Sequence, residues 1–320
     1  MNKTTKVWLM VAAALVLTGC AVFTGGMMML NWNFSKLSTV SYETTEHEIA
    51  KDFKDIAVKT DTADITFAVS ENEKSTVVCH EQKNAVHRVT VKEDSLVVEL
   101  IDERKWYEHI GIGFDTPKIT VYLPHREYGA LSISSATGSV VLPDDFSFRQ
   151  IDITESTGNV VNRASATESL KIKATTGNIR VENITAGWFD LTVSTGKVTV
   201  SDVTCQGDAV INVSTGDVSV TGLTCKNLIT DGSTGDIVLN NAIAAEKFSV
   251  TRSTGDVKFD HCDAAEIFVQ TDTGKVTGSL LTDKVFIVQS DTGRVDVPKT
   301  VTGGRCEITT DTGDIRITVG

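Results

Sequence analysis

Thr-Gly preceded by Ser, Thr, Ala or Asp recurs ten times in this 320-residue chain, at intervals of 19 or 20 residues. Self-similarity at one fixed period is typical of a solenoid, in which each coil packs against its neighbours. We expect these dipeptides to form stacked structural corners. The ten copies are Thr137 and Gly138, Thr157 and Gly158, Thr176 and Gly177, Thr195 and Gly196, Thr215 and Gly216, Thr234 and Gly235, Thr254 and Gly255, Thr273 and Gly274, Thr292 and Gly293, and Thr312 and Gly313.

The residues around each glycine alternate between apolar and polar. Positions seven and five before the glycine are mostly apolar, as at Leu131 and Ile133, and position two after it is always Val or Ile. This period of two predicts strands with one buried face. One residue falls out of the alternation at Thr-Gly, so we expect a bend there, with the threonine hydroxyl bonded to backbone groups.

A weaker apolar pair follows seven and nine residues after the glycine, as at Val203 and Cys205. Each coil therefore holds at least two short strands. The predicted fold class is all-β, a single-stranded parallel β-helix of about ten coils, ~48 Å long at ~4.8 Å per coil. The C-terminal copy should lie at the open end of the stack, where charges such as Arg305 and Glu307 discourage further stacking.

The chain before the repeats is β-rich but irregular. Asp61 to Ile65 resembles a degenerate copy of the repeat, and the surrounding segment is expected to cap the solenoid. We therefore divide the chain into an anchor at 1–35, a β-rich cap at 36–130 and the solenoid repeats at 131–320. The strand candidates in the cap are 56–60, 64–69, 76–80, 89–91, 96–101 and 119–123.

Residues 7–30 form an uncharged apolar segment that is long enough to cross a bilayer. Lys3 and Lys6 precede it, which favours a cytoplasmic N-terminus and places residues 36–320 outside the membrane. We expect an uncleaved single-pass anchor. The alternative is a lipoprotein, since Leu17 to Cys20 resembles a lipobox and would leave Cys20 as a lipidated N-terminus.

The overall charge and the cysteines exclude some classes of function. A formal net charge of −12 argues against a nucleic-acid partner. The six cysteines show no CxxC spacing, so no zinc-ribbon or thioredoxin-type motif is indicated. Cys205 and Cys225 lie one repeat apart and should stack on adjacent coils, either as buried thiols or as a disulfide.

Few residues are candidates for metal or catalytic chemistry. Asp217, Asp236 and Asp256 follow successive glycines and are weak calcium candidates. Their stacked carboxylates would repel one another, and a calcium ion between them would offset that repulsion. A solvated corner without a cation is the alternative, favoured by the flanking Lys197 and Lys275. Three Asp-Thr-Gly copies match the aspartic-protease tripeptide, but they occupy successive rungs instead of facing each other, which disfavours a protease.

The histidines concentrate in the cap. Five of the six lie there, at positions 47, 80, 87, 109 and 125. Cys79 and His80 are adjacent, so on a strand they point to opposite faces. Scattered surface histidines are therefore favoured over a metal site, and no cofactor motif is present.

The segment from Ser41 to Asp64, the strand from Ile119 to Pro124 and the Ser-Thr-Gly-Asp-Val repeats together resemble the bacterial DUF4097 family. The resemblance covers roughly residues 40–320. It implies a membrane-anchored parallel β-solenoid described as an adhesin, and it supplies no catalytic residues. We expect a noncatalytic surface protein that binds a cell-wall, glycan or other envelope ligand. The alternatives are an envelope-stress scaffold acting through a membrane protein and a polysaccharide-active enzyme.

Overall fold

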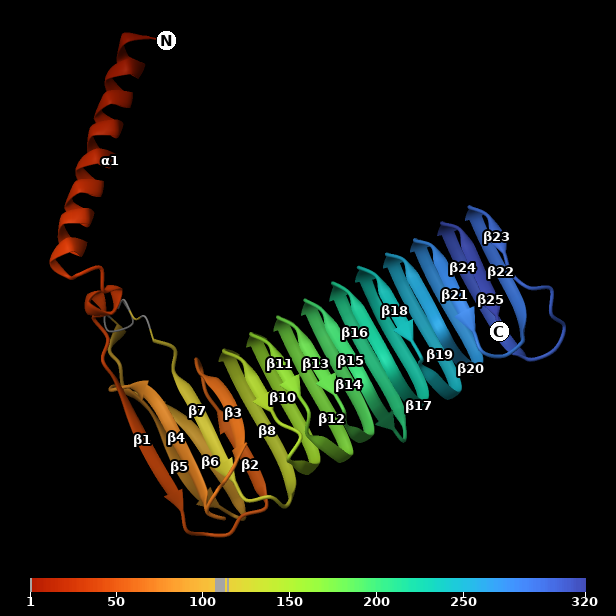
Figure 1. Ribbon diagram of the computed structural model, residues 1–320, viewed down its shortest axis with the longest axis horizontal. Helices are drawn as coiled ribbons and strands as arrows, with labels where there is room; N and C mark the ends of the chain where they lie inside the picture. Colours follow the sequence, from red (N-terminus) through yellow and green to blue (C-terminus); the bar gives the residue numbers. More distant parts are fainter. Residues whose placement is uncertain (1, 107–112, 114) are drawn as a thin grey trace.

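Every second residue of the repeats is buried, and this alternation builds a stack of parallel strands around one apolar interior. The computed structural model describes residues 2–106, 113 and 115–320 and confirms a β-solenoid of about ten coils behind an N-terminal helix (Figure 1). The positions expected to face inward, such as Leu131, Ile133 and Val140, are buried.

In most coils a long strand ends at the Thr-Gly corner and a strand on the second side follows it. Equivalent residues of successive coils pair in register, so Thr157 pairs with both Thr137 and Thr176. The strands of the regular stack are β8 (Glu127–Thr137), β9 (Val140–Leu142), β10 (Ser147–Thr157), β11 (Val160–Asn162), β12 (Ser165–Thr176), β13 (Ile179–Glu182), β14 (Thr185–Thr195), β15 (Val198–Cys205), β16 (Asp208–Thr215), β17 (Val218–Thr234), β18 (Ile237–Asn240), β19 (Ile243–Thr254), β20 (Val257–Thr273) and β21 (Val276–Leu280).

At the N-terminal end the parallel stack begins earlier than residue 131. Strands β2 (Asp55–Lys59) and β3 (Asp64–Val69) pair in parallel with β8 and β9, and Thr62 bridges to Thr137. Strands β6 (Ser95–Asp102) and β7 (Lys118–Leu123) add a further parallel rung outside them. The degenerate repeat at 61–65 is therefore a genuine corner of the stack.

Antiparallel strands close this end of the solenoid. Strand β5 (Ala85–Lys92) pairs with β6, and β4 (Ser75–Gln82) pairs with β7. Strand β1 (Tyr42–Ile49), which the sequence did not indicate, pairs with β4 at the edge. These strands cover the edge that a parallel stack would otherwise leave open. A cluster of aromatic rings, including Phe67 and Phe148, fills the core beneath them.

At the C-terminal end the order in space differs from the order in the chain. Strands β24 (Gly304–Thr312) and β25 (Ile315–Val319) lie between β20–β21 and the earlier strands β22 (Lys284–Thr292) and β23 (Val295–Asp296). Figure 1 shows β23 and β22 beyond β25. The expectation that the last repeat forms the open end is wrong, because the chain turns back and inserts that repeat one rung inward.

This insertion changes which residues are exposed. Ile317 is buried between two coils, so a charge there would disturb the stack itself. In the terminal rung, Val295 is 45% exposed, although it occupies a column that is buried in every other repeat. The reason is that, among the described residues, no further coil packs on the outer side of β22 and β23.

The apolar N-terminal segment forms helix α1 (Lys3–Met29), followed by the short 3-10 helix η1 (Phe34–Leu37). Helix α1 has a mean hydropathy of 2.2 over its most apolar stretch and is long enough to cross a membrane. None of that stretch is buried against the rest of the chain. Figure 1 shows it projecting from the cap end of the solenoid.

Candidate functional site

Each corner glycine lies directly against the backbone of the next coil. A Cβ atom on Gly158 would lie 1.6 Å from the carbonyl oxygen of Gly138, and one on Gly216 would lie 1.9 Å from that of Gly196. The φ angles of Gly158 and Gly216 are +154° and +134°, which disfavour other residues. Glycine is therefore required by the stacking of the coils as well as by the turn.

The ten corner threonines form an exposed ladder in which each pairs with the equivalent residue on the next coil. Their hydroxyl groups make no hydrogen bond within the described residues, so the expected hydroxyl–backbone bonds are wrong. The threonine carbonyl makes the contact instead, as when Gly196 N donates to Thr215 O at 3.0 Å. The row of hydroxyls is thus free to contact solvent or a ligand.

The three calcium candidates belong to a different ladder. Asp236 N donates to Asp217 Oδ1 at 3.1 Å, and Asp256 N donates to Asp236 Oδ1 at 2.8 Å. Asn159 and Asn178 make equivalent bonds in earlier coils. The side-chain oxygen of the residue after each of these glycines therefore accepts a hydrogen bond from the backbone N–H of the equivalent residue on the next coil. Among the described residues these aspartates do not bring three ligand oxygens within 4.8 Å of one another.

We name one surface of the solenoid the long-strand face. It is the outer face of the strand segments that end at the Thr-Gly corners, in β12, β14, β16, β17, β19, β20, β22 and β24. It carries apolar and cationic side chains together. Trp188 and Ile229 are 38% and 36% exposed. Lys171 Nζ lies 5.1 Å from the Trp188 ring centroid, and Lys247 Nζ lies 4.3 Å from that of Phe268. A shallow cavity of 210 Å³ lies beside Phe268. Aromatic and cationic groups of this kind are common in binding surfaces.

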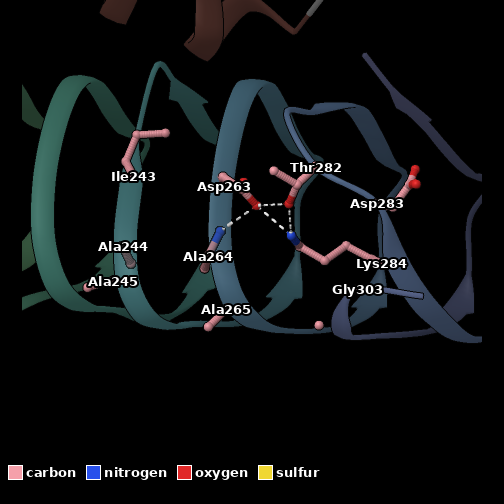
Figure 2. Close-up of a pocket in the computed structure, with 11 residues that line it drawn as sticks. Ile243, Ala244, Ala245, Asp263, Ala264, Ala265, Thr282, Asp283, Lys284 and Gly303 are labelled. Atoms are coloured by element: carbon pink, nitrogen blue, oxygen red, sulfur yellow. Dashed lines mark hydrogen bonds and ion pairs between the residues drawn. The ribbon is translucent and has the colours of Figure 1, made fainter.

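A second cavity of 550 Å³ marks the junction where the chain crosses to the terminal rung. Figure 2 shows Lys284 reaching Asp263 and Thr282 there. Lys284 Nζ lies 2.6 Å from Asp263 Oδ1, and its side chain is almost fully buried. Alanines and glycines, including Ala265 and Gly304, supply much of the remaining lining. Because the ammonium is already paired, the pocket offers no free cation to an anionic ligand.

A buried arginine occupies an inward column of the solenoid, in which Glu155 is also charged and the other described coils carry small or apolar residues. Arg252 Nη1 donates to Val213 O at 2.8 Å, and its side chain fills the space beside Gly232. Burial lowers the pKa of Arg252, while nearby carboxylates, including Asp231, raise it. Its Nε and Nη2 atoms have no hydrogen-bond partner in the described part of the chain.

The cap contains a cavity of 360 Å³ with polar walls. Arg104 lines it and is held by Asp102 and by Gln82 Oε1 at 2.9 Å. His87 also lines this cavity, although its side chain is almost completely buried. The cavity opens between the strands that close the N-terminal end of the stack.

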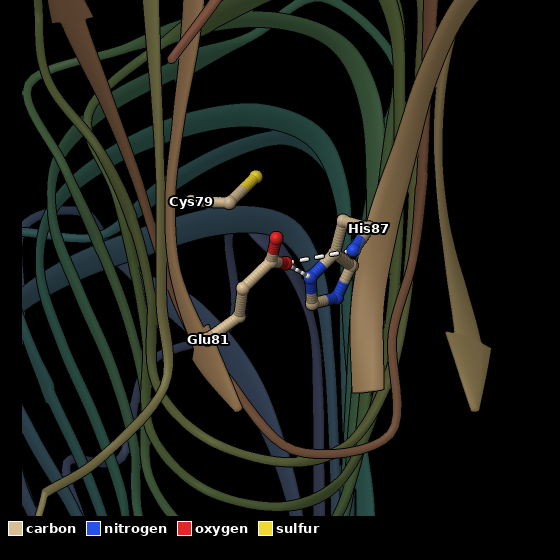
Figure 3. A group of neighbouring side chains, drawn as sticks. All are labelled: Cys79, Glu81 and His87. Atoms are coloured by element: carbon tan, nitrogen blue, oxygen red, sulfur yellow. Dashed lines mark hydrogen bonds and ion pairs between the residues drawn. The ribbon is translucent and has the colours of Figure 1, made fainter. Parts of the chain in front are cut away.

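Behind His87 lies a buried group that sequence reasoning missed. Cys79, Glu81 and His87 point toward one another in Figure 3, and their ligand atoms lie within 4.8 Å of one another. His87 Nδ1 lies 2.7 Å from Glu81 Oε2. Two features of the sequence could have indicated this group. Cys79 and Glu81 are two residues apart, so they share one face of a strand, and His87 lies on the strand that follows. His80 instead stacks on Tyr42, and His109 lies outside the described residues.

All six cysteines are free thiols, so Cys205 and Cys225 form no disulfide. Cys20 is exposed on helix α1, whereas the other five are buried. Burial raises the pKa of the Cys79, Cys225 and Cys306 thiols to about 12, so they stay protonated at neutral pH.

Comparison with solved structures finds distant similarity to several bacterial proteins. A "putative adhesin" from Bacteroides fragilis is 16% identical, with a TM-score of 0.44, over 87% of this chain and 97% of that one. A "putative adhesin" from Parabacteroides distasonis is 12% identical, with a TM-score of 0.49, over 87% and 98%. A "putative lipid binding protein" from the same organism is 14% identical, with a TM-score of 0.49, over 88% and 98%.

At these identities and TM-scores the three structures carry no argument about function. They are named as adhesins or as a lipid-binding protein, not as enzymes. None of the curated proteins matches the chain. The family model described as Toastrack DUF4097 matches residues 53–214 and 208–320, which is most of the chain. The chain therefore belongs to the DUF4097 (Toastrack) family.

Proposed function

We propose that this protein is a noncatalytic surface protein, anchored in the membrane by α1, whose solenoid binds a cell-wall or other envelope glycan. The regions are the anchor at 1–35, the cap at 36–130 and the repeats at 131–320, with the β2–β3 rung joining cap and repeats. Residues 36–320 would lie outside the membrane, because Lys3 and Lys6 favour a cytoplasmic N-terminus. An exposed apolar helix beside a large β-domain supports this arrangement.

The observation that carries the proposal is the long-strand face. Lys171 lies over the Trp188 ring there, and Lys247 and Arg305 lie over the half-buried Phe268 ring, although the chain as a whole has a net charge of −12. Arg305 also pairs with Glu307 on the same face. Aromatic rings pack against the apolar faces of sugar rings, and lysine or arginine pairs with acidic substituents. A repeated, elongated surface suits an extended polymer better than a small substrate.

A noncatalytic role fits the distribution of reactive groups. The cluster of Cys, His and acidic side chains found among the described residues is buried in the cap, away from the long-strand face. A polysaccharide-active enzyme would need carboxylates converging in a groove at the bound chain. The shallow cavity beside Phe268 contains one carboxylate, that of Glu307.

A sedimentation assay tests the proposal with the full-length chain in detergent micelles and insoluble cell-wall material. We expect saturable pelleting of the native chain. Replacing both Trp188→Ala and Phe268→Ala should weaken binding by roughly 10-fold or more, as for aromatic hot spots. Lys258→Ala, an exposed change on the second side of the coils, is the matched control and should bind as the native chain does.

Failure of the native chain to pellet would exclude cell-wall binding. Equal pelleting of the double variant and the native chain would exclude the long-strand face. Failure to pellet would favour the scaffold alternative, in which the helix or cap contacts a membrane protein, whereas equal pelleting would move the binding surface to another face. Crosslinking from α1 in intact membranes would then identify that contact.

A further inference from the structure

We propose that Cys79, Glu81 and His87 form a binding site for a thiophilic divalent cation of the Zn²⁺ type, buried in the cap. The inference does not depend on the glycan-binding proposal, because the three residues lie in the solenoid interior and not on the long-strand face.

The strand geometry brings the three side chains together. Cys79 and Glu81 are two residues apart on β4, so both point to the same, inner face. A short turn then returns the chain along β5, which carries His87. The exposed fractions of the three residues are 0%, 1% and 4%. Their sulfur, oxygen and nitrogen atoms lie within 4.8 Å of one another.

The donor set suits a borderline-soft cation. Zn²⁺ binds cysteine sulfur at ~2.3 Å, and histidine nitrogen or carboxylate oxygen at ~2.0–2.2 Å. Tetrahedral ligands at these bond lengths lie roughly 3.5 Å apart, so the pair of Glu81 and His87 must open by about 0.8 Å. The cation replaces the hydrogen bond between Oε2 and Nδ1, and the imidazole then carries its proton on Nε2.

Neighbouring hydroxyl groups already orient two of the ligands. Thr60 Oγ1 lies 2.9 Å from His87 Nε2, and Thr45 Oγ1 donates to Glu81 Oε1 at 2.9 Å. Because a hydroxyl both donates and accepts, Thr60 can hold the tautomer that leaves Nδ1 free for a metal. Glu81 is held at both oxygens, because Oε1 accepts from Thr45 and Oε2, the atom that faces Nδ1, accepts from His87 N at 2.7 Å.

The charges balance in the bound state. A thiolate from Cys79 and a carboxylate from Glu81 supply two negative charges, which neutralise a divalent cation in an interior where isolated charges are costly. Cysteine binds a metal as the thiolate, so its proton must leave when the cation binds. Binding therefore releases the thiol proton, so affinity should fall as the pH is lowered.

The site also has a route to solvent and an unused polar neighbour. His87 lines the 360 Å³ cap cavity, which gives a small cation an approach to the imidazole. On β1, His47 lies on the same strand face as Thr45, and its buried Nε2 has no partner within the described residues. The other buried cysteines do not form such a group with His or acidic residues in the described chain.

The test titrates Co²⁺ into the reduced, chelator-treated full-length chain in detergent and follows thiolate-to-cobalt charge-transfer absorption. We expect one Co²⁺ per chain, displaced by Zn²⁺. Cys79→Ser should abolish the band, and His87→Gln should weaken binding at least 10-fold. Cys306→Ser is the matched control, because Cys306 is equally buried and has an equally raised pKa, and it should retain the band.

Thermal denaturation keeps the result interpretable if a variant loses stability. Zn²⁺ should raise the midpoint of the native chain and of Cys306→Ser by mass action, but not that of Cys79→Ser. Absence of the cobalt band in the native chain would overturn the proposal, whatever the variants do. Retention of the band in Cys79→Ser would overturn it as well, since the metal would then bind elsewhere.

Discussion

Replacing Gly216 with alanine tests how closely the coils stack. The added Cβ would lie 1.9 Å from Gly196 O, whereas ordinary contacts begin at 3.4 Å. The two coils must therefore separate locally by about 1.5 Å, which stretches the bonds from Gly196 N to Thr215 O and from Val198 N to Asp217 O beyond hydrogen-bonding range. Both bonds measure 3.0 Å in the intact stack.

The expected cost has two parts. Losing two hydrogen bonds removes about 1–3 kcal/mol of stability. Holding alanine at a φ of +134° adds about 1–3 kcal/mol, because that region is essentially restricted to glycine. The total of about 2–6 kcal/mol corresponds to a loss of roughly 30-fold to 20,000-fold in amide protection at this rung.

Hydrogen exchange followed by mass spectrometry measures this loss locally, which suits a solenoid whose rungs can open separately. Peptides covering residues 190–220 of the full-length chain should exchange faster in Gly216→Ala. Thr215→Ala is the control and should leave protection unchanged, because its hydroxyl is exposed and unbonded. Protection within 5-fold of the native value in Gly216→Ala would refute the argument that backbone contact demands glycine.

Two further changes probe buried groups of the stack. Arg252→Met should raise the free energy of unfolding by about 1 kcal/mol, because it removes a buried cation whose Nε and Nη2 have no partner among the described residues. A loss above about 2 kcal/mol, measured by calorimetry, would contradict this. Stability should fall from about pH 9 towards pH 12, because the folded Cys225 thiol holds its proton, with a pKa of about 12, while the unfolded thiol releases it near 9.0. Chemical denaturation across that pH range should show a shallower fall in Cys225→Ala, and parallel curves would refute the assignment.

The repeat region was largely predictable, because the information lies in local periodicity. The apolar columns around each glycine alternate as strands require, and in-register stacking follows from the 19- or 20-residue period. The exception is Val295, which has the right residue type for a buried column yet is exposed. Nothing in its own repeat marks it as part of the terminal rung.

The corner residues were predictable as positions but not as contacts. Threonine at the corner suggested a hydroxyl bonded to the backbone, yet Thr215 contributes its carbonyl and leaves the hydroxyl exposed. Asp217 and Asp236 suggested a cation, yet each is linked to its neighbour by an amide-to-carboxylate bond. Which atom of a residue is used depends on the adjacent coil, and a residue type does not specify that.

The amino-acid sequence by itself determined the solenoid, the apolar helix and the cap strands other than β1, because repeats, apolar length and alternation are local properties. Only the tertiary structure decided the order of the rungs. All the Thr-Gly corners have the same residues and nearly the same spacing, so the corner at Gly313 could stack on either side of the corner at Gly293. Long-range pairing places its strand, β24, between β20 and β22. The same long-range pairing of β4 and β5 with the parallel rungs buries Cys79, Glu81 and His87 together.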